Sequence, residues 1–240
     1  MDVKEESILG PEIKDHWYYV SKGRALRMML GSQPVNEVLD VGAGSGVFTR
    51  QLLDHGLAKR GVCVDPGYTA EHVESYNGGE IYFVRGVKDV SQDLILMMDV
   101  LEHVDDDVGL LRKYTDRLPP GGRVAITVPA FQFLWSSHDV FLDHRRRYTL
   151  SQLKKVVTQA DLRVVKARYF FGALFPVVAA IRLRDQLRLM SGKTEAKSQL
   201  KWVPKFIGKS LIGIHDLERY TLFSFNRWAG LTAFCLATRD

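Results

Sequence analysis

The sequence predicts an α/β protein built on a mostly parallel sheet with helices on both faces. Short apolar runs alternate with helical periodicity about five times over the first 128 residues, and this alternation is typical of parallel βαβ units. The run 94–98, Leu-Ile-Leu-Met-Met, is apolar at every position, as expected for a strand buried on both faces. A chain of 240 residues is long enough for one large domain with an added segment.

Seven strands are expected from short apolar stretches that are bounded by turn residues. They are placed at 37–41, 61–65, 81–85, 93–98, 123–128, 163–170 and 231–238. A helix is expected over 17–30, and another is expected to begin at 149–151. The prolines and glycines of Pro119–Gly122 predict the turn that leads into the fifth strand.

The chain divides into three expected parts. Residues 1–34 form an N-terminal helical cap, 35–171 and 229–240 form the core, and 172–228 is a basic amphipathic helical insertion between strands six and seven. The stretch 163–210 holds eleven Lys and Arg against two acids, whereas the whole chain carries only +5. The insertion is interpreted as a lid, and a surface that touches anionic lipid or a lipid-linked substrate is the open alternative.

The stretch 38–46, Val-Leu-Asp-Val-Gly-Ala-Gly-Ser-Gly, reads as a strand, a tight turn and a helix start. Glycine lets a ligand approach the main chain, and the helix start offers free N–H groups to an anionic group. The spacing is G-x-G-x-G, not the G-x-G-x-x-G of dinucleotide-binding proteins, which argues against an NAD-linked oxidoreductase. Asp65 ends the second strand, where a carboxylate can accept both hydroxyls of a ribose.

Together with Asp-Val-Leu-Glu-His at 99–103 and the turn and strand over 121–129, these motifs resemble class I S-adenosylmethionine-dependent methyltransferases. The most similar group acts on small molecules and includes ubiquinone-biosynthesis O-methyltransferases and bacterial proteins of glycan and lipid assembly. The resemblance covers residues 16–150 best. It implies a seven-stranded Rossmann-like sheet, S-adenosylmethionine as cofactor with S-adenosylhomocysteine as product, and methyl transfer to an oxygen of a small-molecule or lipid- or glycan-linked acceptor.

The resemblance also implies the residues that bind the cofactor. The glycine loop would hold its methionine end, Asp40 would lie near its amino group, and Asp65 would bind the ribose. Many relatives place an acid on the loop over the adenine, where this chain has Val87 or Lys88, and either Asp89 or backbone groups would take the place of that acid. The full expected set is Asp40, Gly42, Ala43, Gly44, Gly46, Asp65, Pro66, Val87, Asp99, Val100 and His103.

Methyl transfer to oxygen usually needs a base as well as a positioned acceptor. The candidate bases are His138 and His144, on the loop after the fifth strand, and His103. The residues expected to contact the acceptor are Trp17, Tyr18, Arg24, Trp135 and Arg145. No metal is expected, because the acids and histidines at 138, 139, 143 and 144 fit no recognised ligand spacing.

Two rival functions stay open: an RNA methyltransferase that uses the basic insertion, and a non-catalytic cofactor-binding scaffold. Nucleic acid is not the favoured partner, because the Asn/Asp-Pro-Pro-Tyr/Phe motif of amino-modifying DNA enzymes does not follow the fourth strand. Residues 1–6 lack the apolar core of a signal peptide, the run 169–181 is too short to cross a bilayer, and two separated cysteines indicate a reducing compartment. We expect a cytoplasmic protein, with contact to the inner face of a membrane through 172–214 as an open alternative.

Overall fold

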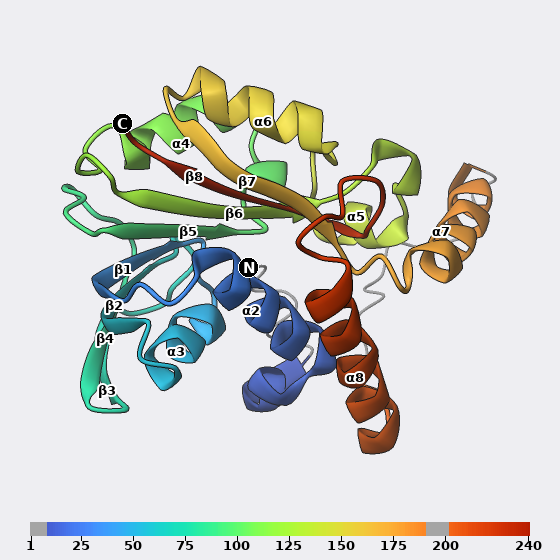
Figure 1. Ribbon diagram of the computed structural model, residues 1–240, viewed down its shortest axis with the longest axis horizontal. Helices are drawn as coiled ribbons and strands as arrows, with labels where there is room; N and C mark the ends of the chain where they lie inside the picture. The colour runs from blue at the N-terminus through green and yellow to red at the C-terminus, as the bar shows by residue number, and fades with distance from the viewer. Residues whose placement is uncertain (1–8, 191–201) are drawn as a thin grey trace.

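The computed structural model describes residues 9–190 and 202–240, and its centre is an eight-stranded sheet of order β3-β4-β2-β1-β5-β6-β8-β7 (Figure 1). Residues 1–6, for which no signal peptide was expected, lie outside the described residues. So do three basic residues of the insertion, Lys193, Lys197 and Lys201.

Five strands form the parallel centre of the sheet. They are β1 (Val35–Val41), β2 (Ala58–Val64), β4 (Gly79–Val84), β5 (Leu94–Met98) and β6 (Arg123–Pro129). The last strand, β8 (Thr232–Thr238), runs antiparallel between β6 and β7 (Arg163–Phe170). The expected mostly parallel α/β sheet is therefore confirmed.

The sheet has eight strands rather than the expected seven, because β3 (His72–Tyr76) pairs antiparallel with β4. The turn between them is Asn77-Gly78, and both residues have positive φ, 49° and 78°. Asn-Gly with this backbone is a strong hairpin signal, which the sequence analysis missed. Residues 65–71 form turns and bends, so β2 leads directly into the β3–β4 hairpin.

Helices cover both faces of this sheet (Figure 1). On one face lie α2 (Trp17–Leu30), α3 (Val47–Asp54) and α8 (Lys205–Thr221), and on the other α4 (Asp107–Thr115) and α6 (Leu150–Gln159). Side chains of β5 alternate between the two cores: Leu94, Leu96 and Met98 join the first, whereas Ile95 and Met97 join the second. The parallel centre is thus buried on both sides, which holds its carboxyl ends at one common edge.

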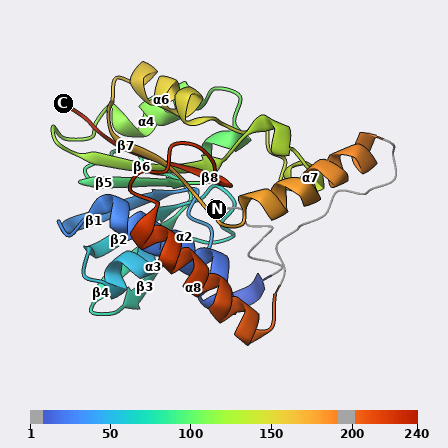
Figure 2. The same cartoon turned by 45° about the vertical axis from the view of Figure 1, so that its right-hand side comes forward.

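The remaining helical segments are short or peripheral. They are η1 (Gly10–Asp15), η2 (Leu101–His103), η3 (Gln132–Leu134), α5 (Ser137–Phe141) and α7 (Phe175–Met190). Figure 2 shows α7 reaching out from the sheet, whereas α8 runs alongside α2. An ion pair between Arg24 of α2 and Asp216 of α8 joins these two helices. None of the helices in the described part of the chain combines the length and apolarity needed to cross a bilayer.

Candidate active site

The glycine loop follows β1 at the carboxyl edge of the sheet. Gly42, Gly44 and Gly46 have φ values of 66°, 52° and 69°, a region that side chains other than glycine rarely adopt. A Cβ atom on Gly46 would lie 3.1 Å from the Sγ atom of Cys63 and from the ring of Phe83. The loop therefore requires glycine for its backbone conformation and, at position 46, for space.

Asp65 at the end of β2 is tied to that loop. Its carboxylate accepts hydrogen bonds from the amides of Gly44, at 3.2 Å, and Gly67, at 2.9 Å. The hydroxyl of Tyr68 donates to the carbonyl of Gly44 at 2.6 Å. The amides of Gly42 and Ala43 both donate to the carbonyl of Val64. The strand end and the glycine loop thus form one rigid unit, in which each oxygen of Asp65 keeps a lone pair for a further donor.

Asp40 lies beneath the loop and is buried. It accepts a hydrogen bond of 2.8 Å from the hydroxyl of Thr49 on α3. Burial raises the pKa of Asp40 to about 6, because the charged carboxylate loses its hydration.

The expected adenine loop follows β4. Asp89 pairs with Arg117 in an exposed ion pair. Val87 and Val100 are half-buried and pack against one apolar cluster, whereas Pro66 is exposed. This part of the edge therefore offers apolar side chains and backbone groups to a planar ring.

Asp99, directly after β5, meets a lysine that the sequence analysis missed. Lys22 of α2 is fully buried and forms an ion pair with Asp99. Its Nζ atom also donates to the hydroxyl of Tyr18 at 3.2 Å, and Thr127 donates to Asp99 at 3.1 Å. Burial alone would raise the pKa of Asp99, but the charge and hydrogen bond of Lys22 hold that pKa below its usual value.

The Asp99 backbone has a φ of 57°, which is uncommon for a residue other than glycine and is typical of functional sites. The signal for Lys22 was present in the sequence. It follows Tyr19 by three residues and precedes Leu26 by four, so it lies on the apolar side of α2.

The three candidate bases lie on two neighbouring segments. The rings of His103 and His144 are 4.8 Å apart and inclined by 80°. The Nδ1 atom of His144 lies 2.9 Å from Oδ1 of Asp139. His138 is buried within α5, and burial lowers the pKa of both His103 and His138 to about 4.

Asp139 organises the loop that carries His144. Arg147 donates to its two oxygens at 2.7 and 3.0 Å, and the amide of Ser136 donates at 2.9 Å. From α7, the guanidinium of Arg182 lies 3.8 Å away. Bidentate pairing with buried Arg147 fixes the carboxylate, and the carboxylate in turn orients the ring of His144.

The expected acceptor contacts separate into three places. Trp17 and Tyr18 pack on Phe171, with ring centroids 6.1 and 5.2 Å apart. Tyr18 also donates to Asp99 at 3.4 Å. Arg24 lies farther along α2 against Asp216.

Trp135 is half-buried between η3 and α5, and Arg145 is exposed. Phe131 and Phe175, with centroids 5.6 Å apart, add an aromatic cluster beside this loop that the sequence analysis did not single out.

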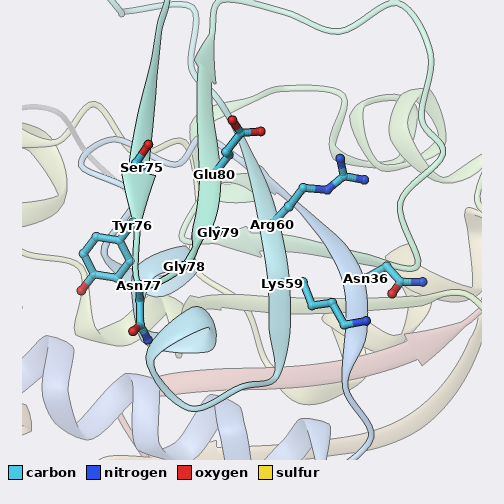
Figure 3. Close-up of a pocket in the computed structure, with 9 residues that line it drawn as sticks. All are labelled: Asn36, Lys59, Arg60, Ser75, Tyr76, Asn77, Gly78, Gly79 and Glu80. Atoms are coloured by element: carbon cyan, nitrogen blue, oxygen red, sulfur yellow. The ribbon is translucent and has the colours of Figure 1, made fainter.

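A separate open pocket of about 880 Å³ lies elsewhere on the molecule (Figure 3). Its lining comes from the beginnings of β1, β2 and β4 and from the β3–β4 turn. In Figure 3 the charged ends of Lys59, Arg60 and Glu80 lie apart from one another instead of converging. None of the predicted site residues lines this pocket, so it is not the candidate active site.

The chain is similar to known methyltransferases. A family model described as "Methyltransferase domain" matches residues 16–167. Demethylmenaquinone methyltransferase of Tropheryma whipplei is 30% identical over 151 residues, which are 60% of this chain and 59% of the relative. The chain therefore spans less than two thirds of the curated relatives that it matches.

Two solved structures share the fold at low sequence identity. Phosphoethanolamine N-methyltransferase 2 of Haemonchus contortus, in complex with S-adenosyl-L-methionine, is 16% identical with a TM-score of 0.57 and covers 98% of this chain and 56% of its own. A SAM-dependent methyltransferase of Archaeoglobus fulgidus is 16% identical with a TM-score of 0.53 and covers 98% of both chains.

Proposed function

The chain belongs to the methyltransferase-domain family, and from this premise we propose that it transfers a methyl group from S-adenosylmethionine to an oxygen of a small-molecule or lipid- or glycan-linked acceptor. The observation that carries the proposal is the rigid unit of Asp65 and the glycine loop, in which the Asp65 carboxylate accepts from the amides of Gly44 and Gly67. When bound, S-adenosylmethionine supplies an electrophilic methyl group on a sulfonium.

The residues of this edge suit that cofactor in their polarity and charge. Asp65 has acceptor capacity left for ribose hydroxyls, and the glycine loop admits a ligand to its main chain. Val87 and Val100 offer apolar sides to an adenine ring. Asp99, kept charged by Lys22, can accept from an ammonium group.

On the acceptor side, the aromatic rings of Trp17, Tyr18 and Phe171 would exclude water from the reacting atoms. Among the histidines, His144 is the best-supported base. Its Nδ1 atom is engaged by Asp139, which selects the tautomer whose Nε2 atom can accept a proton. His138 is a weaker candidate, because burial lowers its pKa to about 4 and so reduces its basicity.

Isothermal titration calorimetry with S-adenosylmethionine tests the proposal, with Asp65→Ala and the control Asp116→Ala, at an exposed residue that directly follows α4. We expect one site per chain in the wild type and in the control, and a loss of affinity of at least about 10-fold in Asp65→Ala, from one or two lost hydrogen bonds. Equal affinities in all three proteins would contradict it. Salt-dependent retention on RNA would favour the rival RNA acceptor, and cofactor binding without turnover on any acceptor would favour the scaffold.

We also propose the division into cap, core and lid. Peripheral contact with an anionic membrane is the alternative to the lid as the role of the insertion. The support is the outer side of α8. Phe206, Leu217 and Tyr220 are highly exposed, and their spacing places them on one face, opposite the buried His215. Lys209 flanks that face, which suits an interfacial helix.

Sedimentation with vesicles tests the membrane contact. Anionic phosphatidylglycerol vesicles are expected to bind the wild type and to bind a Phe206→Ser, Leu217→Ser variant less. Neutral phosphatidylcholine vesicles should bind both proteins weakly. Equal binding of the two proteins to anionic vesicles would contradict a role for α8.

A further inference from the structure

Three metal-ligating side chains meet at the acceptor side of the sheet edge. Glu102 and His103 belong to η2, directly after β5, and His144 belongs to the loop that follows α5. One ligand atom from each residue lies within 4.8 Å of the other two. The amide of Arg145 donates to the carbonyl of Glu102 at 2.6 Å, so the backbone itself holds the two segments together.

Glu102 is the unusual member of this cluster. Its side chain is 0% exposed, yet neither carboxylate oxygen has a hydrogen-bond partner among the described residues. Buried polar groups are normally satisfied, and buried charges are normally paired or bound to a metal. Burying an unpaired carboxylate costs several kcal/mol. A bound cation would supply the partner that both oxygens lack.

His144 is oriented as metal-bound histidines usually are. Its Nδ1 atom is occupied by Oδ1 of Asp139 at 2.9 Å, and Arg147 fixes that carboxylate by two hydrogen bonds. A carboxylate on one ring nitrogen sets the tautomer and directs the other nitrogen toward the ion. The Nε2 atom of His144 is therefore the available ligand.

We propose that Glu102, His103 and His144 bind one divalent transition-metal ion, with Zn²⁺ as the best match. Two imidazoles and one carboxylate form a donor set of catalytic zinc sites, which keep a fourth position open. Ligand atoms around a tetrahedral ion lie about 3.4 Å apart when each bond is about 2.1 Å. The three ligand atoms, which lie within 4.8 Å of one another, would have to approach to that spacing when the ion binds.

This site differs from the set that the sequence analysis weighed and set aside. No metal was expected from the sequence, because the acids and histidines between 138 and 144 have unsuitable spacing. In the structure Asp139 instead supports His144 from behind, and the other two ligands come from η2, more than forty residues earlier in the chain. Sequence spacing alone could not bring these segments together.

The open position gives the ion a chemical role that rests on the proposed methyl transfer to oxygen. An acceptor hydroxyl in that position would have a lowered pKa and would give its proton to water, so that the oxygen reacts as an anion. The site then selects acceptors with a hydroxyl group, and His144 serves as a ligand instead of a base.

Titration of the chelator-treated protein with Co²⁺ tests the site, because the visible absorption of bound Co²⁺ reports stoichiometry and coordination without any acceptor. We expect one ion per chain, displaced by one equivalent of Zn²⁺. Glu102→Gln and His144→Ala should each weaken Co²⁺ binding at least about 10-fold. Loss of a group that only hydrogen-bonds to a metal ligand already weakens metal binding by about 10-fold or more, and these variants remove a ligand itself. The exposed His55→Ala is the matched control and should bind as the wild type does.

Circular dichroism confirms the fold of each variant, and calorimetry with S-adenosylmethionine is run on the same samples. Absence of bound Co²⁺ in the wild type at millimolar concentration, or equal binding by folded Glu102→Gln, His144→Ala and wild-type proteins, would overturn the metal site. Cofactor binding retained in that outcome leaves the proposed function standing, with His144 as the base. If Glu102→Gln fails to fold, His144→Ala alone decides.

Discussion

The ion pair between Lys22 and Asp99 makes a quantitative prediction about stability. The side chain of Lys22 is 0% exposed and that of Asp99 is 25% exposed. Replacing Lys22 with Met keeps the apolar stem of the side chain but leaves Asp99 without its counterion. Removing one partner of a fully buried pair costs about 3–5 kcal/mol. Partial exposure of Asp99 places the expected loss of unfolding free energy at the lower end, about 3 kcal/mol.

For a domain of this size, that loss lowers Tm by about 6–12 °C, at about 2–4 °C per kcal/mol. Differential scanning calorimetry measures it, with Lys14→Met, at an exposed lysine of η1, as the control that should stay within about 0.5 kcal/mol of the wild type. The double variant Lys22→Met, Asp99→Asn should recover part of the loss, because no buried charge is left unpaired. A loss below about 1 kcal/mol in Lys22→Met would refute the idea that the pair is buried and coupled.

The same pair sets the pH range in which its stabilisation is present. The pKa of Asp99 is lowered and that of Lys22 is raised in the folded protein. The carboxylate therefore stabilises the fold above about pH 4, its unfolded pKa, and loses this effect as pH falls through the lower folded value. Lysine stabilises below about pH 10.4, its unfolded pKa, and loses the effect as pH rises through the higher folded value. Between these limits the penalty of Lys22→Met should be constant.

Three further predictions concern the cofactor side of the edge. Asp65→Ala should lose S-adenosylmethionine affinity by at least about 10-fold, from lost hydrogen bonds, whereas Asp116→Ala should not. Gly46→Ala should lower the unfolding free energy by about 1–2 kcal/mol or more in urea titrations, since its φ of 69° is left-handed and the new Cβ meets Cys63 and Phe83; an unchanged urea midpoint would contradict the loop geometry. Burial raises the pKa of Asp40 to about 6, so protonated Asp40 favours the folded state and stability should fall as pH rises from about 4 to 6. Asp40→Asn should remove this part of the pH dependence, and an unaltered profile would assign it to other groups.

Much of the fold could be predicted because its signals are local. The parallel strands are short runs of apolar residues, such as 94–98, and the glycine loop has a fixed spacing over 42–46. The missed strand β3 has a polar and partly exposed sequence, His-Val-Glu-Ser-Tyr, so no apolar run marks it. Only the Asn77-Gly78 turn indicated the hairpin.

The acceptor side could be predicted less well because its contacts are not local. Lys22 reaches Asp99 across 77 positions of sequence. In α8, Phe206, Ile207 and Ile214 recur at helical spacing, yet all three are exposed to solvent, to 71%, 37% and 44%. Periodicity identified the helix, but it could not say which side of the helix packs against the domain. That side is set by His215 and Glu218, which are buried beside α2 and the start of the insertion.

The two halves of the candidate site are consequently held by different means. The cofactor side is built from strand ends and backbone hydrogen bonds, such as those from Gly44 and Gly67 to Asp65. The acceptor side depends on α7, because Asp185 accepts from the amide of Ser137 at 2.8 Å and Arg182 lies 3.8 Å from Asp139. Any displacement of α7 would act on Asp139 and, through Asp139, on the ring of His144. The insertion is therefore coupled to the residue on which both the proposed base and the proposed metal site depend.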